Sequence, residues 1–207
     1  MANLHVLNHP LIQSKLTRLR DASTNNHAFR LLLDELTTLM VYEITRDYPM
    51  REVEVRTPME TTTGSILAVP VTLIPILRAG VGMLGGVLSL IPTARVGHIG
   101  IYRDPKTLRP VEYYSKLPAE LSASRIILVD PMLATGGSVI AAADIVKRAG
   151  GRRIQLLCLV ASPEGIEAMS KAHPDIPIFT ASVDRELDEH AYILPGLGDA
   201  GDRIFGT

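Results

Sequence analysis

Several features that direct a chain to particular functions are scarce in this sequence of 207 residues. The single cysteine, Cys158, can form no internal disulfide, which is typical of a reducing, cytoplasmic environment. Lys and Arg number 21 against 22 Asp and Glu, so the chain lacks the basic excess that drives nonspecific nucleic-acid binding. No apolar run approaches the roughly 20 residues of a membrane span, and the N-terminal residues show no secretory signal. We therefore expect no membrane and no stable nucleic-acid partner.

Common catalytic and cofactor motifs are also missing. The sequence contains no G-x-x-x-x-G-K-[ST], and no G-x-G-x-x-G lies between a strand and a helix, which argues against a P-loop NTPase or a dinucleotide enzyme. Neither G-x-S-x-G nor H-E-x-x-H occurs, so we interpret the six histidines as structural or surface residues. Cys158 lies within the apolar run IQLLCLV and is predicted to be a buried core residue.

The sequence that is present predicts one α/β domain over residues 1–207. Its hydrophobic content of 46% is enough for a full core. Patterns typical of strands lie at residues 52–58, which alternate, and at residues 71–77, 96–102, 125–130, 152–160 and 175–181. Helical spacing follows at residues 11–20, 26–47, 81–91, 138–150 and 163–173. Strands that alternate with helices favour a central, mainly parallel sheet with helices on both faces.

Residues 102–118, YRDPKTLRPVEYYSKLP, are the least regular stretch and contain three prolines. Such a stretch can be an ordinary surface hairpin. A long loop near a ligand site is also a candidate lid, and we predict a protruding β-arm or lid here.

The segment LVDPMLATGGS, residues 128–138, ends a strand on an acid and opens into a glycine loop before a helix. Free backbone amides and the positive end of the helix dipole meet at such a loop, and they suit a phosphate. Asp130 can accept hydrogen bonds from sugar hydroxyls, so the acid and the loop together suggest a ribose 5-phosphate. The alternative is a tight turn that binds no ligand.

Two arginines and the C-terminal segment are further candidates. Arg78 stands at a strand end beside a glycine turn, and Arg103 follows another strand; a guanidinium at either place suits a phosphate, although a solvent-exposed arginine explains each as well. Residues 192–207, YILPGLGDAGDRIFGT, show no helix or strand period. They fit a frayed tail or an ordered loop whose backbone could bind a flat heterocycle, and their apolar residues favour the loop.

Taken together, these segments resemble the uracil phosphoribosyltransferases, which have the type I phosphoribosyltransferase fold. The resemblance covers nearly the whole chain and includes PILRAGVGM, VGHIGIYRDPKTLRPVEYYSKLP, VDPMLATGGS and YILPGLGDAGDRIFGT. It implies transfer of the phosphoribosyl group from 5-phosphoribosyl 1-diphosphate (PRPP) to N1 of uracil, giving UMP and diphosphate in pyrimidine salvage. Pro131 stands where many phosphoribosyltransferases carry a second acid, which is the uracil-specific form of the loop.

The resemblance also implies roles for individual residues. PRPP would be bound by Arg78, Arg103, Asp130, Pro131, Met132, Leu133, Ala134, Thr135, Gly136, Gly137, Ser138 and Asp199. Uracil would contact Ile193, Gly198, Asp199 and Ala200, chiefly through their backbone. Asp199, Asp130 and Arg103 would take part in catalysis.

Cofactor and assembly follow from the same resemblance. Mg²⁺ is expected, bound mainly through PRPP oxygens, and GTP is a candidate allosteric activator for which no residues can be assigned. A homodimer or larger homo-oligomer is expected. The alternative is a regulator that senses PRPP or nucleotides and binds RNA on the same fold. A purine or orotate phosphoribosyltransferase should lack PGLGDAGDR.

Overall fold

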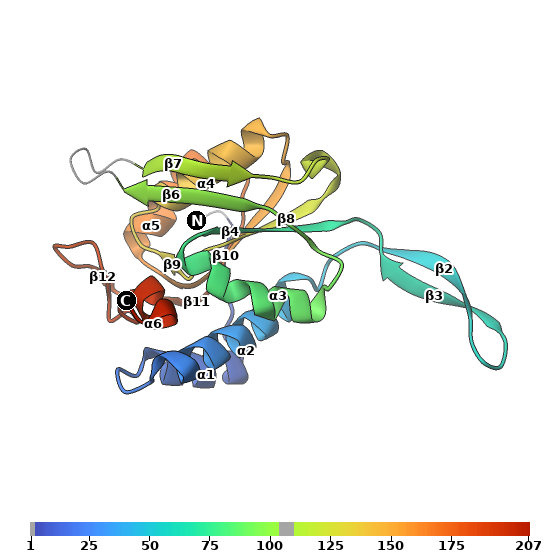
Figure 1. The fold of residues 1–207 in the computed structure, drawn as a ribbon, viewed down its shortest axis with the longest axis horizontal. Coiled ribbons are helices and arrows are strands. Elements are labelled where there is room, and N and C mark those ends of the chain that lie inside the picture. The colour runs from blue at the N-terminus through green and yellow to red at the C-terminus, as the bar shows by residue number, and fades with distance from the viewer. Residues whose placement is uncertain (1–2, 104–109) are drawn as a thin grey trace.

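The computed structural model describes residues 3–103 and 110–207, in which helices pack on both sides of a central sheet (Figure 1). The strands of this sheet are β1 (Leu4–Val6), β4 (Val71–Leu77), β5 (Arg95–Val96), β6 (His98–Arg103), β7 (Pro110–Lys116), β8 (Arg125–Val129), β9 (Met132–Leu133), β10 (Arg153–Ala161) and β11 (Ile178–Val183). The helices are α1 (Pro10–Arg20), α2 (Asn26–Ile44), α3 (Leu84–Leu90), α4 (Gly137–Arg148), α5 (Pro163–Ala172) and α6 (Ala200–Phe205), with the 3-10 turns η1 (Ala79–Met83) and η2 (Leu121–Ala123). Two separate hairpins pair β2 (Met50–Arg56) with β3 (Thr61–Leu67), and β12 (Glu186–Leu187) with β13 (Ile193–Leu194).

The central sheet is mainly parallel. Its order is β1-β11-β10-β8-β4-β6-β7, and of these neighbours only β6 and β7 are antiparallel. Helices α1, α2 and α3 lie on one side of the sheet, and α4 and α5 lie on the other (Figure 1). The predicted fold class is therefore confirmed. Because β4, β6, β8, β10 and β11 are parallel, their carboxyl ends lie along the same edge.

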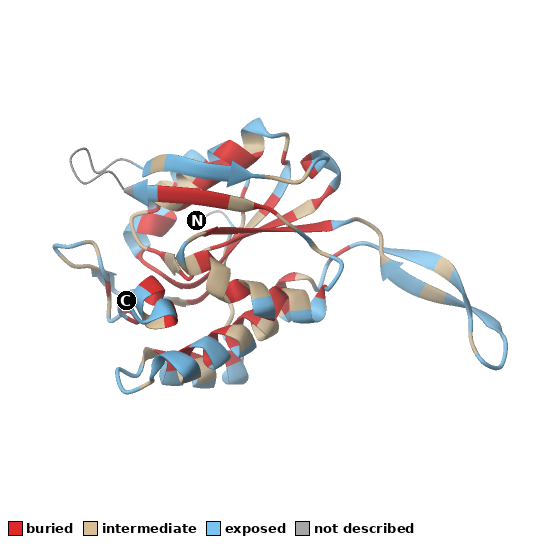
Figure 2. Cartoon of the chain, viewed as in Figure 1, coloured by how far each residue is buried: buried red, intermediate tan, exposed pale blue. Residues whose placement is uncertain are grey.

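Each face of the sheet has its own hydrophobic core, because alternate residues of a strand point to opposite faces. Leu73 and Leu157 belong to the core beneath α1–α3, whereas their neighbours Ile74 and Leu156 belong to the core beneath α4 and α5. The central strands are consequently buried on both sides (Figure 2). Cys158 lies in the second core as predicted, and burial raises the pKa of its thiol to about 12, so the thiol stays protonated.

The helices follow the predicted pattern, with small differences at their ends. α2 buries Phe29, Leu36 and Met40 against the sheet and ends at Ile44, three residues before its predicted end. His9 caps α1 by accepting a hydrogen bond from the Leu11 amide at 3.2 Å, which gives it the structural role that we expected. In the part of the chain that the structure describes, no helix has the length and apolarity to cross a membrane.

Residues 102–118, for which the sequence predicted a hairpin, arm or lid, do form part of a hairpin, and the sequence missed a second one. They contribute the end of β6 and all of β7, which pair at the edge of the central sheet. Residues 104–109 of the predicted lid lie outside the described residues, so the lid stays a prediction. The second hairpin, of β2 and β3 (residues 50–67), extends from the body as an arm (Figure 1). Its second strand was missed because Thr61–Thr63 and Gly64 give no apolar alternation.

Candidate active site

Five residues with useful chemistry lie at the carboxyl ends of parallel strands. Arg78 follows β4, Arg103 ends β6, Asp130 follows β8, Ser162 follows β10, and Asp184 follows β11. The structure thus brings three predicted residues, Arg78, Arg103 and Asp130, to one edge of the sheet, although the Arg103 side chain lies outside its description. Ligands of open α/β sheets bind at this edge, which defines the candidate site.

Asp130 and Pro131 interrupt a strand at this edge. β8 and β9 pair with β10 in the same register, and these two residues form the break between them. The Pro131 carbonyl accepts hydrogen bonds from the Leu159 and Val160 amides at 2.9 and 3.2 Å, while the Asp130 carboxylate accepts one from the Met132 amide at 3.2 Å. The break therefore holds the carboxylate of Asp130 at the start of the predicted phosphate loop.

The loop passes into a helix at Gly136, whose φ of 81° lies in the left-handed region that favours glycine. α4 begins at Gly137, and Ser138 lies in its first turn. The first amides of a helix have no partner within it, so the start of this helix is suited to bind an anion. The strand, loop and helix predicted for residues 125–150 are thus confirmed as structure, and the phosphate remains a prediction.

Ser162 supports the phosphate loop through hydrogen bonds to the backbone of the loop. This fully buried serine caps α5, because its Oγ accepts a hydrogen bond from the Gly165 amide at 2.9 Å. The same hydroxyl donates to the Ala134 carbonyl at 2.7 Å, and the Ser162 amide donates to the Leu133 carbonyl at 2.9 Å. A Cβ added to Gly165 would collide with the Ala134 carbonyl oxygen, so glycine is required for this close approach.

Asp130 is the most perturbed carboxyl of the site. Burial raises its pKa, the hydrogen bond from the Met132 amide lowers it, and the nearby charge of Asp199 raises it again, to about 7. Two predicted residues 69 positions apart in the sequence are thus close enough to interact electrostatically. A site that makes a carboxylate difficult to ionise will gain from a ligand that brings cations or hydrogen-bond donors.

Arg78 is held loosely at the other side of the site. Its guanidinium lies 3.7 Å from the Asp202 carboxylate, and 61% of its side chain is exposed. Asp202 belongs to α6, so Arg78 faces the C-terminal segment. An exposed guanidinium with one distant partner remains available for an anionic ligand.

The C-terminal segment is an ordered loop followed by a short helix. Ile193 is buried in β13, and Asp199 caps α6 by accepting a hydrogen bond from the Asp202 amide at 2.9 Å. The expectation of an ordered loop over a frayed tail is confirmed. The absence of any helix was wrong, because AGDRIF is too short and too rich in Gly and Asp to show a helical period.

Three charged residues around this loop were not predicted. Arg20 at the end of α1, Asp184 after β11 and Arg203 in α6 all form hydrogen bonds with the backbone of residues 196–197. Arg20 and Asp184 are 164 residues apart, so no local pattern could have paired them.

The carboxylates suit a divalent cation held mainly by a ligand. Asp130 and Asp199 offer the oxygen donors that Mg²⁺ prefers. Within residues 3–103 and 110–207, no group of three or more His, Cys, Asp or Glu side chains is arranged to hold a metal alone. Two carboxylates would leave the other ligand positions of such a cation to water or to a bound molecule.

Comparison with solved structures defines the class of protein. The fold matches a hypoxanthine-guanine phosphoribosyltransferase of Bacillus anthracis with a TM-score of 0.53 and 10% identity, over 77% of this chain and 80% of that one. It also matches the APRTase of Giardia lamblia with a TM-score of 0.51 and 17% identity, over 75% and 81% of the two chains. The fold is therefore that of the type I phosphoribosyltransferases.

Sequence comparison then identifies the family. The family model described as uracil phosphoribosyltransferase matches residues 6–207. Relatives with that name in Symbiobacterium thermophilum and Acidovorax ebreus are 59% and 56% identical over the full length of both chains. A solved structure of an Aquifex aeolicus protein has a TM-score of 0.94 and 36% identity, over 99% of this chain and 98% of that one. The chain belongs to the uracil phosphoribosyltransferase family.

Proposed function

We propose that this enzyme transfers the 5-phosphoribosyl group of PRPP to N1 of uracil, giving UMP and diphosphate. The observation that carries the proposal is that the phosphate loop after β8 and the C-terminal loop meet at one edge of the sheet, in a chain of this family. One loop suits a ribose phosphate and the other suits a base, so the two halves of the product would be held side by side.

The sugar-phosphate half is assigned to residues 130–138. The 5-phosphate would bind at the start of α4, around Thr135, Gly136, Gly137 and Ser138. Asp130 would accept hydrogen bonds from the ribose hydroxyls, and Pro131–Ala134 would shape the loop between them. This arrangement is supported by the left-handed Gly136 and by the Ser162 contacts beneath the loop.

The diphosphate is assigned to Arg78 and Arg103. As the bond from ribose C1 to diphosphate lengthens, negative charge grows on the leaving group and positive charge grows on the sugar. Arg78, exposed and facing the site, is suited to stabilise the leaving group, while Asp130 and Asp199 are suited to the cationic sugar. Asp130 and Asp199 would hold Mg²⁺ together with oxygen atoms of the substrate, and the ion would supply charge neutralisation there.

Uracil is assigned to the backbone of Ile193 and of Gly198–Ala200. Fixed amides and carbonyls can distinguish the edge of uracil from that of cytosine, because a cytosine amino group facing an amide donor would leave both unpaired. Such a mismatch can reduce specificity constants by about four powers of ten. The base must also be held in line with C1, so that N1 forms the new bond as the diphosphate departs with the electrons of the old one, and the N1 proton is released to the diphosphate or to water.

A direct assay tests the reaction. The protein is incubated with PRPP, Mg²⁺ and one of four bases: uracil, cytosine, orotate or hypoxanthine. We expect UMP and diphosphate in equal amounts from uracil and no product from the other three. Turnover of cytosine at a comparable rate would contradict the backbone recognition of uracil. PRPP binding without turnover of any base would contradict the enzyme assignment.

The regulatory RNA-binding alternative has no support in the comparisons. It predicts salt-dependent RNA binding that changes when PRPP is added, so an RNA-binding titration run beside the activity assay distinguishes the two.

We also propose a cytoplasmic homodimer or larger homo-oligomer. The lone, buried Cys158 supports the reducing location, and the exposed β2–β3 arm supports assembly. GTP activation stays a prediction with no residues assigned, and the same assay with and without GTP tests it.

A further inference from the structure

An ion pair binds both backbone groups of Gly196, in the loop between Ile193 and Gly198. Arg20 contacts the Asp184 carboxylate with two nitrogens, each at 2.6 Å, and only 2% of the Asp184 side chain is exposed. The Gly196 amide donates to Asp184 at 2.9 Å, and the Gly196 carbonyl accepts from Arg20 at 2.6 Å. The pair is thus built around one residue of the loop.

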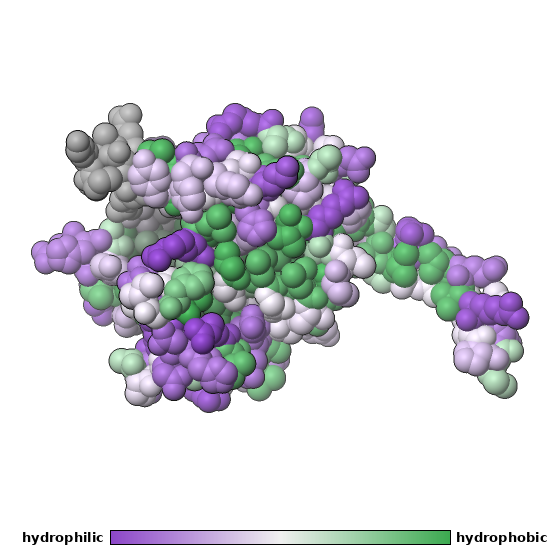
Figure 3. All heavy atoms as spheres, viewed as in Figure 1, coloured by the Kyte–Doolittle hydropathy of each residue, from purple (hydrophilic) through white to green (hydrophobic). Residues whose placement is uncertain are grey.

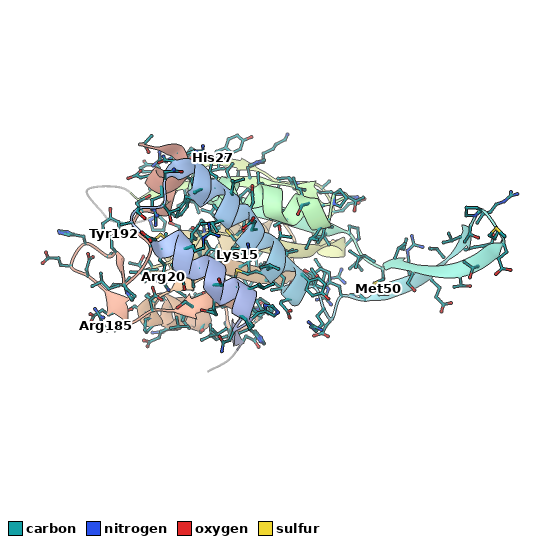
Figure 4. All side chains as sticks on the ribbon, turned by 90° about the horizontal axis from the view of Figure 1, so that it is seen from below. Lys15, Arg20, His27, Met50, Arg185 and Tyr192 are labelled. Atoms are coloured by element: carbon teal, nitrogen blue, oxygen red, sulfur yellow. The ribbon has the colours of Figure 1, made fainter. Side chains whose placement is uncertain are left out.

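A second arginine, Arg203, binds the carbonyl of the next residue, Leu197. Arg203 donates to the Leu197 carbonyl at 2.9 Å, and the same nitrogen donates to the Leu19 carbonyl at 2.8 Å. Its guanidinium lies over the Phe29 ring at 4.5 Å from the ring centre. The loop is therefore tied to α1 and α2 through charged side chains. Figure 4 shows Arg20 at the end of α1, beside the C-terminal segment that carries Tyr192.

These contacts fix three consecutive peptide planes. The amide of Gly196, the carbonyl of Gly196 and the carbonyl of Leu197 belong to three successive peptide units, and each has a charged partner. In a trans peptide unit the carbonyl and the following amide point in opposite directions. With the Leu197 carbonyl directed at Arg203, the Gly198 amide must point away from Arg203.

We propose that Arg20, Asp184 and Arg203 form a positioning unit that orients the Gly198 amide toward uracil. The inference rests on the proposed function, since Gly198 was assigned to uracil there. None of the three side chains needs to touch a substrate. Their role is to keep the peptide planes of the loop in the one orientation that presents a donor to the base.

The chemistry of the pair fits this role better than general stabilisation. A buried ion pair contributes little net stability, because removing two charges from water offsets their attraction. A bidentate arginine and carboxylate pair has a fixed, planar geometry, which suits it to hold other groups in place. Asp184 also accepts a hydrogen bond from the Ser182 hydroxyl at 2.7 Å, so the carboxylate itself cannot rotate freely.

The test is Arg20→Lys, because lysine keeps the charge but cannot bind Asp184 through a planar fork and reach the Gly196 carbonyl as well. We expect KM for uracil to rise about tenfold or more, while the Kd for PRPP, measured without uracil, changes by less than about twofold. The matched control is Arg18→Lys on the same helix, where the arginine is exposed; its KM for uracil should equal that of the wild type.

A folded Arg20→Lys protein with an unchanged KM for uracil would overturn the proposal. Equal losses in uracil and PRPP binding would also overturn it, because they indicate a general structural role. If Arg20→Lys does not fold, Asp184→Asn serves instead: the amide oxygen can still accept from Gly196 but loses the ionic fork, so the same selective rise in KM for uracil is expected. A wild-type protein that does not use uracil would refute the proposed function itself.

Discussion

At the scale of single residues, the ionised Asp130 carboxylate lowers the folding stability of the free protein. The free protein holds this carboxyl where burial and Asp199 raise its pKa to about 7, although the ordinary value is near 4. Because the folded pKa lies above the unfolded one, the unfolded state gives up its proton first as pH rises. Stability is therefore lost between about pH 4 and pH 7, and the loss is complete above pH 7.

Asp130→Asn should stabilise the free protein and inactivate it. At pH 8 the substitution removes a half-buried negative charge, and we expect an increase in unfolding free energy of about 1–2 kcal/mol. This is below the full effect of the pKa shift, because the residue keeps some contact with water. The gain should vanish near pH 4. Denaturant unfolding at the two pH values measures it, and a variant less stable than the wild type at pH 8 would refute the account.

Arg78→Gln should lower activity while leaving stability almost unchanged. The side chain is exposed and has one ion-pair partner at 3.7 Å, so stability should change by less than about 0.5 kcal/mol. Loss of the leaving-group contact should reduce kcat/KM for PRPP by about 100-fold. Arg95→Gln is the control: Arg95 is also exposed and pairs with Glu120 at 3.4 Å, but it begins β5 at the opposite end of the sheet. Equal activities of the two variants would exclude a role for Arg78.

Residue roles could be predicted only where a local pattern carries them. Asp130 and Gly136 stand out because strand, acid and glycine loop are contiguous. Arg20 and Asp184 acquire their role from a contact across 164 residues, and each is an ordinary charged residue in its own segment. The role of Ser162 could not be predicted either, because its hydroxyl donates a hydrogen bond to a carbonyl 28 residues away.

At the scale of elements, Ser162 connects the start of α5 to the phosphate loop that precedes α4. Ser162→Ala would remove both the helix cap and the hydrogen bond to the half-buried Ala134 carbonyl. We expect a loss of about 1–3 kcal/mol in unfolding free energy. The Kd for PRPP should also rise severalfold, as titration of the free enzyme would reveal.

Thr57→Ala is the matched control for Ser162. Its hydroxyl also bonds backbone groups, accepting from the Glu60 amide at 3.0 Å, but it lies in the turn of the arm. That variant should bind PRPP as the wild type does. If Ser162→Ala loses stability with no change in PRPP affinity, the cap holds the helix without shaping the loop.

The predicted elements were right where periodicity was strong. The run VTLIPIL became β4 without a shift, since both faces of a central parallel strand are buried and its residues are uniformly apolar. β3 and α6 were missed because neither has that signal: one is a solvated strand, and the other is a six-residue helix. Tertiary context, and not local propensity, determines both.

At the scale of the molecule, the arm is a two-stranded hairpin without a core. None of its strand residues is buried, and the register places Val53, Val55 and Ile66 on one face. Apolar residues are visible along the arm in Figure 3, and Figure 4 places Met50 at its base. A lone hairpin with an apolar face is marginal in water, so we expect another chain to cover it.

Ile66→Glu should weaken that assembly. We expect the wild type to have at least twice the 22.5 kDa mass of one chain and the variant to shift toward the monomer, because a charge would be buried in the interface. Light scattering after size exclusion measures both. Ser65→Glu, on the opposite face of the same strand, is the control. A wild-type protein that is monomeric at micromolar concentration would contradict the prediction.

The long separation between Arg20 and Asp184 has a kinetic consequence. The phosphate loop lies within the continuous segment 125–161, whereas the base loop is fixed only after the two ends of the chain have met. Contacts between distant segments form more slowly than local ones. During refolding, the chain should therefore regain PRPP binding before it regains the ability to discriminate among bases. Base selectivity would be the last activity to recover.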